Sequence, residues 1–98
     1  MSITHTVVFS LAHQPGSEAE ADFLDTARET LSRIAGVQEF AVRRQVSASS
    51  PHRFQFSMVF DDQAAYSGYN AHPDHAGFVE GRWKPEVTAF QEYDFVDA

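Results

Sequence analysis

Residues 3–11 read ITHTVVFSL, and this stretch predicts the first strand of an antiparallel sheet. Valine and threonine favour extended backbone, and neighbouring side chains of a strand point to opposite faces. The more apolar set is Ile3, His5, Val7, Phe9 and Leu11. The opposite set is only mildly polar, which predicts that both faces of this strand are covered.

The segment after this strand predicts a long amphipathic helix. Ser17 and Glu20 form a capping box, in which each side chain bonds the backbone N–H of the other residue. We expect the helix to run to about Ala35 and to end at Gly36, because glycine readily adopts the left-handed backbone of a helix terminus. One apolar stripe at helical spacing would face the sheet: Phe23, Leu24, Ala27, Leu31 and Ile34.

Two further strands are predicted at residues 37–46 and 52–60, and the polar residues 47–51 between them indicate a hairpin. In the earlier strand of the pair, Phe40, Val42 and Val46 share a face. The later strand alternates strongly and places four apolar side chains on one face. They are Phe54, Phe56, Met58 and Phe60.

The last third of the chain predicts a divided helical region and a final strand. Asp61 or Asp62 is expected to cap a short helix. Pro73 interrupts that helix and suits the first turn of another, since proline has no N–H to leave unpaired there. We expect Pro85 to close the helical region and residues 87–96 to form the fourth strand.

The order of elements is therefore β-α-β-β-α-β, with the second helical region in two pieces. This order predicts an α+β fold, a ferredoxin-like split βαβ sandwich with a four-stranded antiparallel sheet. The length fits one domain, residues 1–98. Helices would cover one face of the sheet. The nine phenylalanines carry more apolar surface than the core under that face is expected to bury. We therefore expect a homodimer through the other sheet face.

Charge and composition exclude several classes of function. Seven basic against 14 acidic residues give a net charge of −7, which argues against binding to nucleic acid or to anionic membranes. Without cysteine the chain has no disulfide and no thiolate metal site. No signal peptide and no long apolar run is visible, so we expect a cytoplasmic protein with no membrane partner. His72 and His75 stand three apart, but Pro73 places them in different local geometry, so no metal site is expected.

Histidine and tyrosine gather around the second helical break. Residues 69–75 read YNAHPDH, and His75 lies in the first turn of the new helix. If the strand face that carries His5 turns toward the helices, His5 and His75 meet in a cavity between sheet and helix. Tyr69 would then orient a substrate oxygen, and an imidazole would move a proton near neutral pH. Each residue alone fits a structural role at least as well, and only the three together indicate a pocket.

These segments resemble a known family. The opening ITHTVVFSL, the helix end RIAGV at residues 33–37, the stretch YNAHPDHAGFV at residues 69–79 and the closing YDF at residues 93–95 are similar to the stress-responsive α/β-barrel (Dabb) family. The similarity spans essentially the whole chain. It implies a subunit whose sheet packs on the sheet of its twin, forming a dimeric α+β barrel.

The resemblance also implies a set of pocket residues. The family includes a plant polyketide cyclase that performs an aldol cyclisation with no cofactor, in a cavity between sheet and helices. Its polar pocket residues correspond to His5, Tyr69 and His75, and two apolar ones correspond to Phe23 and Leu24. A further histidine and a tyrosine of that cyclase fall on Phe54 and Ala27 here, so the lining differs and the substrate is not carried over.

Three functions are compatible with the sequence. The first is cofactor-free proton transfer on a small hydrophobic or phenolic ligand, with His75 as general base, Tyr69 at the substrate oxygen and His5 as a second polar wall. This pocket would be bounded by Phe9, Phe23, Leu24 and Phe78. The second is a non-catalytic structural or stress-associated dimer whose interior is filled. The third is a monooxygenase-like barrel, for which resemblance to related dimeric barrels implies a differently placed histidine or an Asn–Trp–His set. It is disfavoured because the single tryptophan, Trp83, lies late in the chain near an expected turn.

Overall fold

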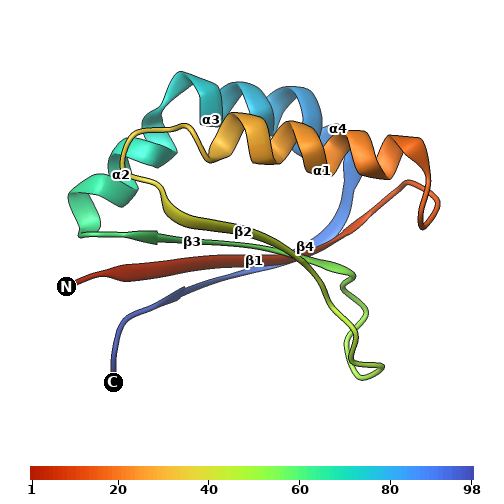
Figure 1. Cartoon of the computed structure of the whole chain (residues 1–98), viewed down its shortest axis with the longest axis horizontal. Helices are drawn as coiled ribbons and strands as arrows, with labels where there is room; N and C mark the ends of the chain where they lie inside the picture. Colours follow the sequence, from red (N-terminus) through yellow and green to blue (C-terminus); the bar gives the residue numbers. More distant parts are fainter.

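The computed structural model, which describes all residues 1–98, places four strands in one antiparallel sheet (Figure 1). The strand order is β2-β3-β1-β4, so the first strand of the chain lies between the third and the last. This arrangement brings both termini to the same end of the sheet (Figure 1). The strands are β1 (Ile3–Leu11), β2 (Gln38–Arg44), β3 (Phe54–Phe60) and β4 (Val87–Phe95).

The helices form a second layer on one face of this sheet (Figure 1). This confirms the predicted α+β ferredoxin-like split βαβ architecture. No helix combines the length and the apolar composition that crossing a bilayer requires. The layer consists of α1 (Glu18–Leu31), α2 (Gln63–Ala71), α3 (Pro73–Phe78), the π-helix η1 (Val79–Trp83) and α4 (Lys84–Glu86).

Strand register decides which side chains face the helices. His5 of β1 lies opposite Met58 of β3 and opposite Asp94 of β4. Because directly opposed residues of antiparallel strands point to the same face, these three side chains share the helix-covered side. The predicted alternation of β3 is confirmed, since Phe54, Phe56, Met58 and Phe60 are each at most 2% exposed.

The hydrophobic core is an aromatic cluster between β1, β3 and α1. The ring of Phe9 lies 4.5 Å from that of Phe56, 5.0 Å from that of Trp83 and 6.0 Å from that of Phe23, measured between centroids. Phe23 and Phe56 are fully buried. This packing accounts for much of the unusually high phenylalanine content, and burial of such rings is a main source of stability in a small domain.

The end of the first helix differs from the prediction. α1 stops at Leu31, four residues before Ala35, and the chain continues through turns in which the amide of Ile34 donates to the carbonyl of Leu31. Gly36 does adopt a left-handed φ of +92°, but it serves the last of these turns and does not cap α1. Ile34 nevertheless remains 3% exposed, because the turns return its side chain to the core.

The second helical region also differs from the prediction. It does not end at a proline, because helical backbone continues from α3 through η1 into α4 and reaches Glu86. Pro85 is accommodated at the start of α4, where proline's missing N–H is least costly. The predicted apolar face of the second strand is shorter than expected, because β2 ends at Arg44 and leaves Val46 90% exposed.

Candidate functional site

A cavity of about 380 Å³ lies between the sheet and the second helical region. Small-molecule sites in proteins are typically about 300–1,000 Å³ and mostly apolar with a few polar groups. Ten of the 15 residues that line this cavity are hydrophobic. Its dimensions and composition are therefore those of a small-molecule pocket.

The strands and the helices each supply one wall. Val7, Phe56 and Met58 form the sheet side, and all three are buried. On the helix side, Phe78, Val79 and Trp83 come from α3 and η1. The exposed members mark the mouth, which lies toward the edge strand β4: Asn70, Lys84, Phe90 and Glu92.

A hydrogen-bonded group of three side chains lies on the β1–β4 side of the pocket. The imidazole Nδ1 of His5 is 2.6 Å from Oδ1 of Asp94 and 2.9 Å from the hydroxyl of Tyr66. The same hydroxyl donates to Oδ2 of Asp94 over 3.1 Å. The β1–β4 register places Asp94 directly opposite His5, although 89 residues separate them in sequence.

Two buried tyrosines of α2 belong to this part of the pocket: Tyr66 is a member of the group, and Tyr69 lies beside it. Burial, reinforced by the hydrogen bond with Asp94, raises the pKa of Tyr66 to about 12. Burial also raises the pKa of Tyr69 well above its ordinary value. Because removing the proton would leave a poorly solvated phenolate, both phenols stay protonated at neutral pH. They are therefore available as hydrogen-bond donors and not as bases.

His75 lies half-buried in α3, against Tyr69. The centroids of the two rings are 4.5 Å apart. Burial lowers the pKa of His75, and the neighbouring His5 acts in the same direction, while the backbone of Asn70 partly opposes the shift. A lowered pKa keeps this imidazole neutral at physiological pH. His75 is thus in the protonation state in which it accepts a proton.

The structure brings four of the seven predicted site residues into this pocket. His5, Tyr69, His75 and Phe78 all line it. Three other predicted lining residues lie elsewhere, which corrects the expected boundary. Phe9 and Phe23 fill the aromatic core beside the pocket, and Leu24 of α1 packs at the periphery of that core.

The position of Phe9 has a simple physical reason. It follows His5 by four residues on the same strand face, and a strand rises about 3.3 Å per residue. This separation of roughly 13 Å carries Phe9 past the pocket and under Trp83. Leu24 precedes the buried Ala27 and Leu31 on α1, and only Leu31 reaches the cavity.

Sequence reasoning missed three side chains that matter to the site: Tyr66 and Trp83, which line the pocket, and Asp94, which bonds His5. Nothing in the sequence pairs Tyr66 of the short helix with a distant side chain, and Trp83 lies near an expected turn. Asp94 had a usable signal, because it alternates with Tyr93 and Phe95 and therefore points to the opposite face of β4. A carboxylate on that face of β4, which pairs with the strand that carries His5, is the signal by which Asp94 can be recognised.

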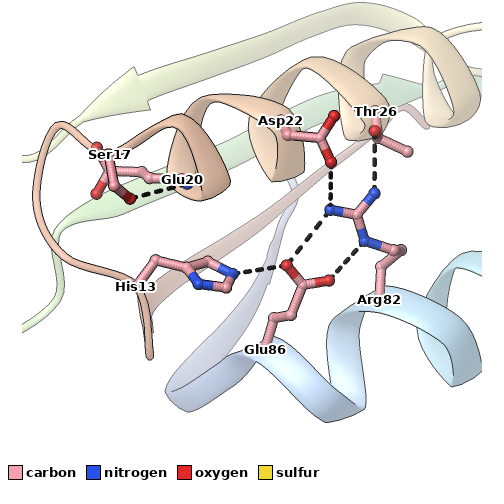
Figure 2. Close-up of polar contacts among 7 residues, drawn as sticks. All are labelled: His13, Ser17, Glu20, Asp22, Thr26, Arg82 and Glu86. Atoms are coloured by element: carbon pink, nitrogen blue, oxygen red, sulfur yellow. Dashed lines mark hydrogen bonds and ion pairs between the residues drawn. The ribbon is translucent and has the colours of Figure 1, made fainter.

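A second polar cluster holds the helical wall of the pocket in place (Figure 2). The guanidinium of Arg82 donates from Nε to Glu86 over 2.5 Å, and its other nitrogens reach Asp22 and Thr26 of α1 at 2.9 and 3.1 Å. His13, in the loop after β1, completes the cluster with a contact of 2.6 Å to Glu86. This cluster ties η1 and α4 to α1 and to the end of β1.

Comparison with known proteins places the chain among relatives of the same fold. The profile of the family described as "Stress responsive A/B Barrel Domain" (Dabb) matches residues 3–97. A Dabb family protein with a ferredoxin-like fold from Mesorhizobium loti is 50% identical, with a TM-score of 0.98, and the match covers 99% of this chain and 97% of that one. No curated protein matches the sequence.

Two more distant solved structures share the fold. One is a dimeric ferredoxin-like protein of unknown function from Thermobifida fusca, 16% identical with a TM-score of 0.82, covering 98% of this chain and 91% of that one. The other is SnoaB, a cofactor-independent oxygenase from Streptomyces nogalater, 19% identical with a TM-score of 0.73, covering 98% and 92%. At these identities the similarity establishes the fold alone.

Proposed function

The chain belongs to the stress-responsive A/B barrel domain family, and we propose that its pocket binds a small phenolic or carbonyl compound and transfers a proton on it without a cofactor. One observation carries this proposal. The neutral imidazole of His75 lies against the protonated phenol of Tyr69, 4.5 Å between ring centroids, inside a largely apolar cavity. Removing a proton from a carbon next to a carbonyl group requires at least a base for that proton and a hydrogen-bond donor for the carbonyl oxygen.

The two residues have distinct roles in this reaction. His75 accepts the proton from the carbon next to the carbonyl. The phenol of Tyr69 makes no hydrogen bond to another protein side chain and is not among the buried polar atoms that lack a partner, so its hydroxyl is free to donate to the carbonyl oxygen. That bond strengthens as negative charge develops on the oxygen, and so it stabilises the enolate. His5, whose ring centroid lies 6.4 Å from that of Tyr69, forms a second polar wall.

The cavity volume supports this function over a purely structural dimer. A filled interior, with the two imidazoles bonded to each other or to backbone, would leave no space beyond that of a water molecule. Instead, about 380 Å³ is open between His5 and the helices, and an engineered apolar cavity of only about 150 Å³ already holds benzene. The pocket is therefore large enough for a substituted aromatic ring.

A cofactor-free oxygenase is the second candidate, and one observation favours it. Trp83 and Asn70 line the same pocket as His75, although the sequence had indicated a turn for Trp83. Both candidate reactions begin with proton removal from the ligand. They differ in whether the resulting anion then consumes molecular oxygen, so oxygen uptake in the same assay distinguishes them.

We further propose that the chain forms a homodimer through the open face of the sheet. Tyr93 and Phe95 lie on that face, are 45% and 53% exposed, and stack with ring centroids 5.9 Å apart. Two such faces packed together would cover these rings. Light scattering coupled to gel filtration should give a dimer for the wild type and a monomer for Tyr93→Arg. A monomeric wild type would contradict the proposal.

The test of the proposed chemistry combines binding with isotope exchange. The purified protein is titrated calorimetrically with small phenols and 1,3-diketones, and NMR then follows deuterium exchange at the carbon between the carbonyl groups of a bound diketone. We expect the wild type to accelerate exchange. His75→Ala should lose about 100-fold of that acceleration, as is typical of a general base, and Tyr69→Phe at least about tenfold.

His52→Gln is the matched control, because it removes a half-buried imidazole outside the pocket. Circular dichroism verifies that each variant is folded. If no compound binds to the wild type, or if His75→Ala and Tyr69→Phe exchange at the wild-type rate, the proposed function is wrong.

A further inference from the structure

The hydrogen bonds of His5 fix which of its ring nitrogens carries a proton. An ionised carboxylate has no proton to give, so the 2.6 Å contact between Asp94 and Nδ1 requires Nδ1 to be the donor. In a neutral imidazole the other nitrogen, Nε2, then carries no proton. Nε2 of His5 is therefore a hydrogen-bond acceptor.

Tyr66 holds the carboxylate in the orientation that this bond needs. Its hydroxyl lies near both Nδ1 and Oδ2, but Nδ1 already donates to Oδ1, so the phenol proton goes to Oδ2. Asp94 is thus held through both oxygens, one by His5 and one by Tyr66. This matters because the carboxylate is 47% exposed and would otherwise turn freely toward solvent.

The unprotonated Nε2 of His5 faces the pocket. Nε2 of His5 forms no hydrogen bond within the chain, and it is not among the buried polar atoms that lack a partner, which are Nδ1 of His52 and Nε of Arg53. Solvent therefore reaches it. Since the residue is only 7% exposed and lines the cavity, the space it meets is that of the pocket.

The charges around His5 disfavour a ligand that brings a negative charge and no proton. The carboxylates of Asp94 and Glu92 come from β4, the neutral phenols of Tyr66 and Tyr69 from α2, and the neutral imidazole of His75 from α3. The single cation, Lys84, lies at the mouth and is paired with Glu80 over 2.5 Å. A ligand carboxylate would meet like charge here, whereas a hydroxyl group would meet an unoccupied acceptor.

We propose that His5 and Asp94 form a proton-accepting dyad that selects ligands with a weakly acidic hydroxyl group, a phenol or an enol. The ligand O–H bond breaks and an Nε2–H bond forms, so the bound state pairs a phenolate or enolate with an imidazolium. Asp94 stabilises that imidazolium and is a positioning residue. This inference rests on the proposed function, because the same pocket must admit the ligand.

The probe for this dyad is 4-nitrophenol, whose neutral and ionised forms differ in absorption. At a pH about one unit below its pKa in water, about a tenth of the free probe is ionised. We expect binding to the wild type to raise the ratio of ionised to neutral probe about tenfold or more, since an adjacent opposite charge moves a pKa by about 1–3 units. The readout needs no turnover.

Asp94→Asn is the decisive variant. An amide can donate to Nδ1 and so moves the ring proton to Nε2, which turns the acceptor into a donor without changing its shape. We expect the bound probe to return to about its ionisation in water. The matched control is Asp97→Asn, which removes an exposed carboxylate two residues beyond β4 and should leave the tenfold change intact.

Nitrogen NMR of the wild type tests the tautomer directly, which covers the case in which Asp94→Asn fails to fold. In the free protein the neutral form of His5 should carry its proton on Nδ1, and saturation with 4-nitrophenol should protonate Nε2 as well. Protonation at Nε2 in the free protein, or an Asp94→Asn variant that ionises the probe like the wild type, overturns the dyad. If the probe binds in its neutral form while diketone exchange still depends on His75, the dyad fails and the proposed function stands. No binding of either compound class overturns both.

Discussion

Replacing Arg82 with methionine should loosen the helical wall of the pocket. Arg82 is the only residue that joins η1 to both α1 and α4, through Asp22, Thr26 and Glu86 (Figure 2). Methionine keeps most of the aliphatic stem and removes the guanidinium. Glu86, whose side chain is 16% exposed, then keeps only its contact with His13.

The magnitude follows from how well each partner is shielded from water. A hydrogen bond to a charged group is worth about 1.5–3 kcal/mol when it is shielded. The bond to Glu86 qualifies, whereas Asp22 is 69% exposed and its ion pair adds little in high dielectric. We therefore expect a loss of about 2 kcal/mol, which lowers the melting temperature of a domain of this size by roughly 10 °C.

The loss should also depend on pH. Arg82, followed by His13, lowers the pKa of Glu86 below its ordinary value of 4.5. A carboxyl group with a lowered folded-state pKa adds stability above the unfolded-state value, and this stability disappears as pH falls through the folded-state value. The difference between wild type and Arg82→Met should thus be full at pH 7 and shrink below pH 4.5.

Urea unfolding followed by circular dichroism measures this difference at each pH. Lys84→Met is the matched control, because Lys84 and Glu80 form an i,i+4 pair like that of Arg82 and Glu86, but both side chains are more than 60% exposed. The control should cost less than about 0.5 kcal/mol. Equal losses in the two variants, or an Arg82→Met loss that is the same at pH 4 and pH 7, would refute the assignment of the stability to the shielded pair.

Three further results are expected. The rate of diketone exchange should rise with pH through a midpoint below 6.5, because only the neutral form of His75 accepts a proton; a pH–rate profile with its midpoint above 6.5 would contradict this. Asp62→Ala should lower the free energy of unfolding in urea by about 1 kcal/mol, because the Asp62 side chain accepts a hydrogen bond from the amide of Ala65 at the start of α2. Asp61→Ala is the control and should cost much less, because Asp61 does not cap this helix. Phe56→Ala should cost about 3–5 kcal/mol by the same measurement, because the ring is 2% exposed in the aromatic core, and a loss below 1 kcal/mol would show that the core collapses around the gap.

The strands could be predicted from the sequence because their side-chain period is a local property. The two-residue period of ITHTVVFSL places His5 and Phe9 on one face, and in the structure both side chains are buried on that face. Helix ends were less predictable. Gly36 signalled a left-handed residue correctly, but the pattern could not show that turns would begin at Ser32. The backbone conformation of Gly36 does not reveal at which earlier residue the hydrogen bonds of α1 end.

The site was predictable where local spacing or an expected strand face groups its residues, and not where a contact depends on strand register. Tyr69 and His75 lie six residues apart around one helix break, so local spacing groups them, and in the structure their ring centroids are 4.5 Å apart. The contact between His5 and Asp94 depends on the register of β1 against β4, which is fixed by packing over the whole sheet. Distance along a strand also separated Phe9 from the pocket, although it shares a face with His5.

The π-helix η1 makes the pocket wall sensitive to changes in chain length. Its wider turn spans Val79–Trp83 and contains one residue more than an α-helical turn. One further residue inserted here would exceed the extra residue that this turn already absorbs and would rotate everything downstream by about 100°, which carries Trp83 away from the cavity and Arg82 away from α1. A change of length in the exposed 47–49 loop would leave both in place. Among descendants of this sequence, gaps should therefore accumulate in that loop, while the spacing from Phe78 to Glu86 stays constant.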